Sequence, residues 1–205
     1  MSKINIIEAK VITLGESGVG KSSIIKRFIY NKFEDNALST IGIDFSFKEI
    51  ILENNVTIKL KLMDTSGQEK FRALSKSYYK NADGVFFVFA LNNMDSFKKV
   101  EEWIKTFNEN YISNQDIPKF LVGNKNDLSY KEIDQTLIED FSSMYNMKYY
   151  EASAKTNSNI DELFQDIGQK LYDNYLKSGG GKGIQIKNKD INIKKNNCCT
   201  ISSDL

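Results

Sequence analysis

The chain has 205 residues and a formal net charge of +1, with 40% hydrophobic and 12% aromatic residues. This length and composition predict one domain of ordinary size with its own core. The charge is uneven: residues 178–205 hold five Lys and two Asp, a net of +3, which leaves 23 basic and 25 acidic residues before them, a net of −2. The body has no basic excess, so we expect no nucleic-acid partner.

The chain contains two cysteines and no histidine, which leaves little scope for a Cys/His metal site or a histidine-based catalytic triad. The N-terminal residues lack the long apolar run and small-residue cleavage site of a signal peptide. Ser2 stands where the myristoylation pattern needs glycine. No stretch approaches the ~18 apolar residues of a membrane span. We expect a soluble protein of the cytoplasm.

Apolar runs alternate with helical patterns along the chain. Continuous or short apolar runs predict strands, and a stripe at helical spacing predicts helices. The expected strands are 10–15, 84–91, 119–124 and 148–153, and the expected helices are 20–30, 95–111, 131–145 and 159–176. Residues 45–52 and 56–64 have period-two alternation with no helix between them, which predicts a hairpin.

This order of elements predicts an α/β fold of the doubly wound type, a mostly parallel six-stranded sheet with one antiparallel edge strand. Ligands of such sheets bind at the carboxyl ends of the strands. We expect the domain to span residues 1–177. Residues 178–205 are rich in glycine, lysine and asparagine, and we expect them to form a flexible basic tail.

The segment GESGVGKS, residues 15–22, fits the phosphate-loop pattern G-x-x-x-x-G-K-[ST] between a strand and a helix. Glycines let the backbone N–H groups converge on phosphates, and the helix N-terminus adds its positive end. Lys21 would reach the β- and γ-phosphates, and the Ser22 hydroxyl would bind Mg²⁺. The pattern predicts a P-loop NTPase.

Three further polar segments follow predicted strands. In DTSGQ, residues 64–68, Asp64 could hold Mg²⁺ through water, the Gly67 N–H could contact a γ-phosphate and Gln68 could orient an attacking water. In NKND, residues 124–127, a carboxylate such as Asp127 could accept hydrogen bonds from guanine N1–H and the 2-amino group, which adenine lacks. In SAK, residues 153–155, the Ala154 N–H could meet guanine O6.

With these four motifs in this order, residues 8–176 resemble the Ras-like small GTPases and, within them, the Rab family. IGIDF (41–45), KLKLMDTSGQE (59–69), QEKFRAL (68–74) and YYKNADG (78–84) carry the Rab resemblance. The resemblance implies a Mg²⁺-dependent, slowly GTP-hydrolysing switch in vesicle trafficking. Implied partners are GTP and GDP, an exchange factor, an activating protein and effectors, with the chain itself a monomer.

The resemblance implies roles for a larger set of residues. Gln68 is the implied catalytic residue, and Mg²⁺ contacts fall on Ser22, Thr40 and Asp64. Implied nucleotide contacts are Gly15, Ser17, Gly18, Val19, Gly20, Lys21, Ser22, Ser23, Phe33, Thr40, Asp64, Gly67, Asn124, Lys125, Asp127, Ser153, Ala154 and Lys155. Implied switch and effector residues are Ile41, Gly42, Ile43, Asp44, Phe45, Met63 and Tyr78.

The sequence departs from the family pattern in three places. Ser66 stands where alanine is usual, and we expect its hydroxyl to slow hydrolysis. Met63 replaces the usual tryptophan in the apolar patch with Phe45 and Tyr78, which indicates an unusual effector set or a neutral core substitution. Six residues, TISSDL, follow the Cys198–Cys199 pair, more than the usual family endings allow.

The cysteine pair suggests attachment to the cytosolic face of membranes. Two lipid chains give a stable anchor where one gives marginal binding, and the lysines of the tail would add attraction to anionic lipid. The last four residues contain no cysteine and are not a prenylation box. Prenylated, palmitoylated and unmodified cysteines all stay open.

Two other functions compete with the GTPase switch. A nucleotide-locked binding module that recruits partners without cycling is favoured by Ser66 and opposed by Thr40 and Gln68. A P-loop ATPase or small-molecule kinase is opposed by the NKND and SAK segments.

Overall fold

The structure, a computed structural model, describes residues 4–35, 43–65, 76–113, 116–179 and 185–189. Its elements follow the predicted alternation of strands and helices. In chain order they are β1 (Ile4–Leu14), α1 (Lys21–Tyr30), β2 (Ile43–Ile51), β3 (Thr57–Thr65), α2 (Lys76–Tyr79), β4 (Gly84–Ala90), α3 (Met94–Lys98), α4 (Val100–Asn110), β5 (Lys119–Asn124), α5 (Gln135–Met144), β6 (Lys148–Glu151), α6 (Ile160–Lys177) and β7 (Gln185–Lys189).

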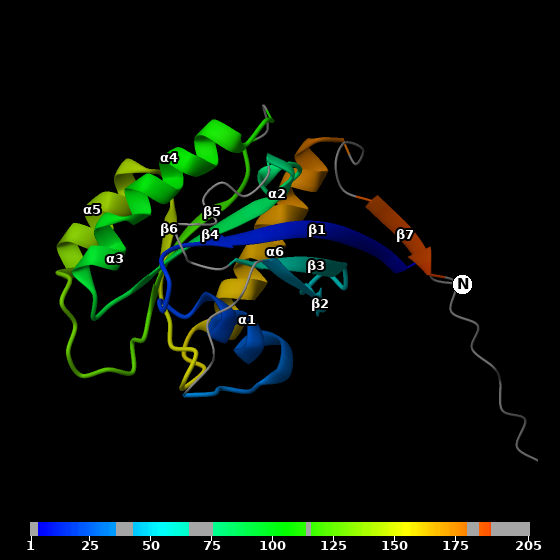
Figure 1. The fold of residues 1–205 in the computed structure, drawn as a ribbon. Helices are drawn as coiled ribbons and strands as arrows, with labels where there is room; N and C mark the ends of the chain where they lie inside the picture. The colour runs from blue at the N-terminus through cyan, green and yellow to red at the C-terminus, as the bar shows by residue number, and fades with distance from the viewer. Residues whose placement is uncertain (1–3, 36–42, 66–75, 114–115, 180–184, 190–205) are drawn as a thin grey trace, which may run out of the picture.

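The central sheet confirms the predicted fold class (Figure 1). Its strands lie in the order β2-β3-β1-β4-β5-β6, and β1, β3, β4, β5 and β6 are parallel. Only β2 at one edge of this row is antiparallel, paired with β3 in the predicted hairpin. The carboxyl ends of the parallel strands therefore meet at one edge of the sheet, where ligands bind in folds of this kind.

The sheet is covered on both faces, as its continuous apolar strands predict. In β4, Phe86 and Val88 face a core closed by α1 and α6, whereas Phe87 and Phe89 face a core closed by α2 to α5. These side chains are at most 1% exposed, and each buried ring contributes about 1.5–3 kcal/mol of transfer free energy. Because β4 is fixed from both sides, the loops at its end rest on a rigid support.

Several boundaries differ from the sequence-based ones. The helix expected over 95–111 is two helices that meet at Lys99. The Ser96 hydroxyl accepts the Ala90 N–H at 3.0 Å, which ties the first of them to the end of β4. The helix expected from residue 131 begins at Gln135, because the Asp134 carboxylate caps it by accepting the Thr136 N–H at 2.8 Å.

Residues 185–189 form a strand, which the sequence analysis did not predict. This strand, β7, pairs antiparallel with β1 in a register that places Ile4 opposite Lys189 and Glu8 opposite Gln185 (Figure 1). β7 pairs with residues 4–8 of β1, and β4 pairs with residues 11–14 of the same strand. Five residues of the expected flexible tail are therefore strand, while the boundary at residue 177 stays a prediction. Within the described ranges, no helix is long and apolar enough to cross a membrane.

Candidate functional site

The phosphate loop connects β1 to α1 at the carboxyl edge of the sheet. Gly15, Gly18 and Gly20 have φ values of 147°, 76° and 98°, a backbone conformation that side-chain-bearing residues rarely adopt. Gly20 precedes α1 without a side-chain cap. The first N–H groups of α1 therefore receive no capping from a side chain at position 20. The backbone N–H groups at a helix N-terminus are a common binding site for phosphate.

Two of these glycines also allow a close approach of neighbouring segments. A Cβ on Gly15 would lie 2.1 Å from the Val88 carbonyl oxygen of β4, and one on Gly20 would lie 2.1 Å from Asn124 Nδ2. A Cβ on Gly18 would meet nothing within 4 Å. The loop is thus packed against the sheet on one side and open at Gly18, which fits a cradle for a ligand.

Lys21, the first residue of α1, is 4% exposed. Its ammonium donates to the carbonyl oxygens of Gly15 at 2.9 Å and Glu16 at 2.8 Å. Burial lowers the pKa of Lys21 to about 8, against the opposing effect of the Asp64 and Glu16 carboxylates. Burial disfavours the positive charge of Lys21, and a phosphate anion beside it would offset that cost. A buried cation held by loop carbonyls is therefore suited to bind phosphate.

Asn124, at the end of β5, joins two of the motifs predicted for the site. Its Nδ2 donates to the Val19 carbonyl of the phosphate loop at 2.8 Å, and its Oδ1 accepts the Ala154 N–H at 3.2 Å. Asn124 is 2% exposed. The phosphate loop and the SAK segment are therefore held together through one buried side chain. The proposed contact of the Ala154 N–H with guanine O6 stays a prediction.

The Asp127 carboxylate is exposed and accepts the Ser153 hydroxyl at 2.6 Å. The same hydroxyl oxygen accepts the Thr156 N–H at 3.1 Å, so Ser153 orders its own loop as well as Asp127. Lys125, two residues earlier, has a φ of 69°, a conformation uncommon outside glycine and asparagine and often found at functional sites. The NKND and SAK segments are thus joined by the contact between Asp127 and Ser153.

Arg27 of α1 is a site residue that sequence reasoning missed. Its Nε donates to the Ala154 carbonyl at 2.7 Å and its Nη2 to the Lys155 carbonyl at 2.8 Å. These bonds tie the SAK segment to the helix that follows the phosphate loop. No motif marks Arg27, since it stands on a helix among other polar residues and its partners lie 127 and 128 positions away.

The other predicted site residues divide into two groups. Ser17 is exposed, Val19 is buried, and Ser22, Ser23, Phe33 and Asp64 are partly buried. Thr40, Ile41, Gly42, Ser66, Gly67 and Gln68 lie outside the described residues, as do Cys198 and Cys199. Asp64 is close enough to Lys21 to affect its charge, which places a carboxylate beside the phosphate loop.

The residues predicted for the effector patch are only partly exposed. Phe45 is 54% exposed, whereas Met63 is 9% and Tyr78 is 2% exposed. Phe45 and Met63 are opposite each other in the β2–β3 pair, and the Tyr78 hydroxyl donates to the Met63 carbonyl at 3.3 Å. The three residues are neighbours, but Phe45 alone offers a large apolar surface. Ile43 and Asp44 lie on the same strand.

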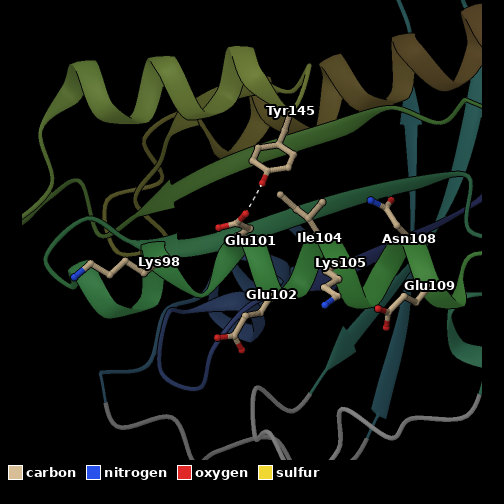
Figure 2. A pocket seen from close by; sticks show the side chains of 8 residues that line it. All are labelled: Lys98, Glu101, Glu102, Ile104, Lys105, Asn108, Glu109 and Tyr145. Carbon is tan, nitrogen blue, oxygen red and sulfur yellow. Dashed lines mark hydrogen bonds between the residues drawn. The ribbon is translucent and has the colours of Figure 1, made fainter.

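A separate hollow of about 580 Å³ lies on the outer side of α4 (Figure 2). It is lined mainly by α3 and α4, and the Tyr145 hydroxyl beyond α5 donates to Glu101 across it at 3.0 Å. None of the residues predicted to contact nucleotide lines it. This hollow is therefore distinct from the candidate nucleotide site.

The fold and the site define a class of protein. A glycine-rich loop between β1 and α1, joined through Asn124 to the loop after β6, on a sheet with one antiparallel edge strand, is the architecture of a Ras-like P-loop nucleotide-binding protein.

Comparison with known proteins agrees with this class. The Ras family model matches residues 10–173. The chain is 37% identical to the Ras-related protein Rab-18-B of Danio rerio, over 91% of this chain and 88% of that protein. It is 37% identical to Rab-11B of Dictyostelium discoideum (92% and 82%) and 36% identical to SEC4 of Saccharomyces cerevisiae (93% and 90%).

The chain belongs to the Rab family of Ras-like small GTPases. Members of this family are GTPases: they bind GTP and GDP with Mg²⁺ and hydrolyse GTP. The predicted family, fold class and enzyme class are confirmed.

Proposed function

We propose that this chain is a monomeric GTP-hydrolysing switch that controls a step of vesicle trafficking. The observation that carries the proposal is the Asn124 side chain, which bonds both the phosphate loop at Val19 and the SAK segment at Ala154. A site built this way couples the loop that would hold phosphates to the loop that would recognise guanine. Binding of the whole nucleotide would then stabilise both.

The chemistry assigned to the chain follows from its own residues. Lys21, whose ammonium donates to the Gly15 and Glu16 carbonyls, would also donate to β- and γ-phosphate oxygens. Ser22, Thr40 and Asp64 would hold Mg²⁺, since hydroxyl and carboxylate oxygens are ligands this ion accepts alongside phosphate and water. When bound, Mg²⁺ would neutralise charge that develops on the phosphates. Gln68 would orient the attacking water.

Such a site needs few protein ligands for the metal. The described residues contain no group of three or more His, Cys, Asp or Glu placed to hold an ion. This agrees with a magnesium site whose remaining ligands come from nucleotide and water. We expect unaided turnover to be slow. Arg27, the one arginine among the described residues, bonds the Ala154 and Lys155 carbonyls, and an activating protein would add roughly 10³–10⁵ in rate.

The switch and its partners follow from the same proposal. GTP would order the segments that contain Thr40 and Gly67, and hydrolysis would release them. Effectors would bind the ordered form over Phe45, which is already exposed on β2. An exchange factor would be needed for release of GDP.

Membrane attachment is proposed through Cys198 and Cys199. The last residue of β7 is Lys189, so the cysteines follow it by nine and ten positions and could extend at most ~36 Å from it. Intact mass of the protein from its own cells, with sequencing of the C-terminal peptide, tests this. Lipid mass on the cysteines would support membrane attachment, and an unmodified tail would direct the search to cytosolic partners.

Guanine selectivity tests the proposal as a whole. The purified chain should bind GTP in competition assays with ATP present in excess, and should hydrolyse it with Mg²⁺. Asp127→Asn should weaken GTP binding by about 10²-fold or more, because an amide offers a donor to the guanine donors. Asp140→Asn, an exposed residue of α5, is the matched control.

Each outcome decides between the functions. Equal competition by ATP would reject the guanine site in favour of a P-loop ATPase or kinase. Tight GTP binding without measurable single-turnover hydrolysis would favour the nucleotide-locked module.

A further inference from the structure

The phosphate loop contains an acidic residue, Glu16, whose side chain is only 14% exposed. Its Oε1 accepts the indole N–H of Trp103 at 3.1 Å, and its Oε2 lies 3.2 Å from the Lys99 ammonium. Lys99 lies at the junction of α3 and α4, and Trp103 lies one turn into α4. The carboxylate is therefore held against these helices.

The backbone of the same residue takes part in the candidate nucleotide site. The Glu16 carbonyl accepts the Lys21 ammonium at 2.8 Å. One residue thus contacts α4 through its side chain and the phosphate-binding lysine through its main chain. A backbone rearrangement at Glu16 that followed loss of the first contact would disturb the second.

A carboxylate in a phosphate loop is electrostatically unfavourable. Like charges repel, and the repulsion is stronger where burial reduces the effective dielectric constant. The two donors, Lys99 at the α3–α4 junction and Trp103 of α4, offset this in different ways. Lys99 supplies a positive charge and is itself 44% exposed, whereas Trp103, the only tryptophan of the chain, is 2% exposed and supplies a neutral N–H in a fixed position.

We infer that Trp103 and Lys99 are positioning residues for nucleotide binding: they hold the Glu16 carboxylate away from the phosphates and so keep the Glu16 carbonyl in place to orient Lys21. The inference rests on the proposed nucleotide site. It assigns to α4 a role in nucleotide retention that no motif of the sequence indicates.

The inference makes a specific prediction about combinations of variants. Trp103→Phe keeps an aromatic ring, a smaller one, but removes the N–H, and it should raise the GDP dissociation rate about tenfold by freeing a negative charge. Lys99→Met keeps the apolar stem and should raise the rate about threefold. In the Glu16→Gln background neither substitution frees a charge, so each should change the dissociation rate less than about twofold.

The experiment measures dissociation of a fluorescent GDP analogue from the full chain with Mg²⁺, in six variants and the wild type. The six are Trp103→Phe and Lys99→Met alone, Glu16→Gln alone, the two combinations with Glu16→Gln, and Lys98→Met. Lys98 precedes Lys99 but lines the outer hollow of Figure 2, so Lys98→Met should leave the rate unchanged. Thermal unfolding of each GDP-loaded variant is measured alongside.

A purely structural role for the contact predicts a different pattern. In that case Trp103→Phe would raise the rate equally with Glu16 or Gln at position 16, in step with its loss of thermal stability, and the inference would be wrong. Should Trp103→Phe fail to fold, the same comparison is made with Lys99→Met, alone and combined with Glu16→Gln, because the Lys99 side chain is 44% exposed. A wild-type chain that retains no guanine nucleotide would overturn the proposed function as well, whereas normal retention with unchanged Trp103 and Lys99 variants would overturn only this inference.

Discussion

Asn124 and Val19 are 105 positions apart in the sequence and are joined by a buried hydrogen bond of 2.8 Å from the amide Nδ2 to the carbonyl oxygen. The other atom of the amide, Oδ1, accepts the Ala154 N–H. The Asn amide offers a donor and an acceptor on two separate atoms, so it can satisfy one backbone group on each side. An ionised aspartate in the same place would have no N–H to donate, so its oxygen would face the Val19 carbonyl oxygen, and both are acceptors.

Asn124→Ala should therefore both loosen the site and destabilise the fold. Two buried backbone groups would lose their partner, and each such loss costs about 1–3 kcal/mol. We expect the free energy of unfolding to fall by about 2–4 kcal/mol and the Kd for GDP to rise at least about tenfold. Urea denaturation and nucleotide titration check the two effects. Asn126→Ala, two residues along and partly exposed, should change both much less.

The succession of strands along the chain and the four motifs could be predicted, because each is a pattern of neighbouring residues. GESGVGKS needs its glycines at fixed offsets, and β4 and β5 are continuous apolar runs. Such signals are local, so the sequence contains them whole. Parallel strands have their carboxyl ends at one edge of the sheet. Because Asp64, Asn124 and Ser153 each come at the end of a strand, they are predicted to lie at the same edge as the phosphate loop.

The contacts that bind the motifs to one another could not be predicted in this way. Arg27 reaches the Ala154 carbonyl and Trp103 reaches Glu16 across 127 and 87 positions, and the sequence offers many other backbone carbonyls and carboxylates that could have been their partners. The strand β7 was missed for a related reason. Its pairing uses backbone groups of β1, which are the same for every residue, so a polar segment without an apolar face gave no signal.

Ser66 provides a test of the hydrolysis rate. It lies outside the described residues, and its hydroxyl is expected near the γ-phosphate from the family resemblance. One additional hydrogen bond in the ground state is worth about 1 kcal/mol, so Ser66→Ala should speed single-turnover hydrolysis about fivefold. The GTP Kd is measured in parallel to separate binding from chemistry. Equal rates for the two proteins would show that the hydroxyl has no effect on the reaction.

Asp83 offers a test of stability away from the nucleotide. Its Oδ2 accepts the backbone N–H of Lys10 at 2.8 Å, which joins the start of β4 to β1. Burial raises its pKa to about 6 from 3.8, against the opposing effects of that bond and of the Lys10 charge. The folded state thus favours the protonated carboxyl, and stability falls as the pH rises from about 4 to about 6.

Asp83→Asn removes this dependence while keeping an oxygen that can accept the Lys10 N–H. A shift of about two pKa units corresponds to at most about 3 kcal/mol at pH 7.5, so the variant should be more stable there by up to that amount. The gain should shrink to near zero at pH 4. Urea denaturation at both pH values measures it, with the exposed Asp116→Asn as control. A gain that is the same at both pH values would contradict a titration origin.

Lys21 makes nucleotide binding itself dependent on pH. Without a ligand its pKa is about 8, and the phosphates of GDP would raise it again by favouring the charged ammonium. Below pH 8 the residue is charged before and after binding, so the affinity should be flat. Above pH 8 binding must take up a proton, and the Kd for GDP should rise about tenfold per pH unit until the pKa of the bound state is reached.

Titrations of GDP between pH 7 and pH 9 check this slope. Lys21→Arg is the control, since a guanidinium stays charged throughout the range, and its Kd should be weaker but free of this slope. The same lowered pKa has an opposite consequence for the empty chain. Between pH 8 and 10.5 the unfolded state holds a proton that the folded state has lost, so stability of the nucleotide-free protein should rise with pH. A GDP affinity that is flat across pH 8 would mean that Lys21 does not meet phosphate in the complex.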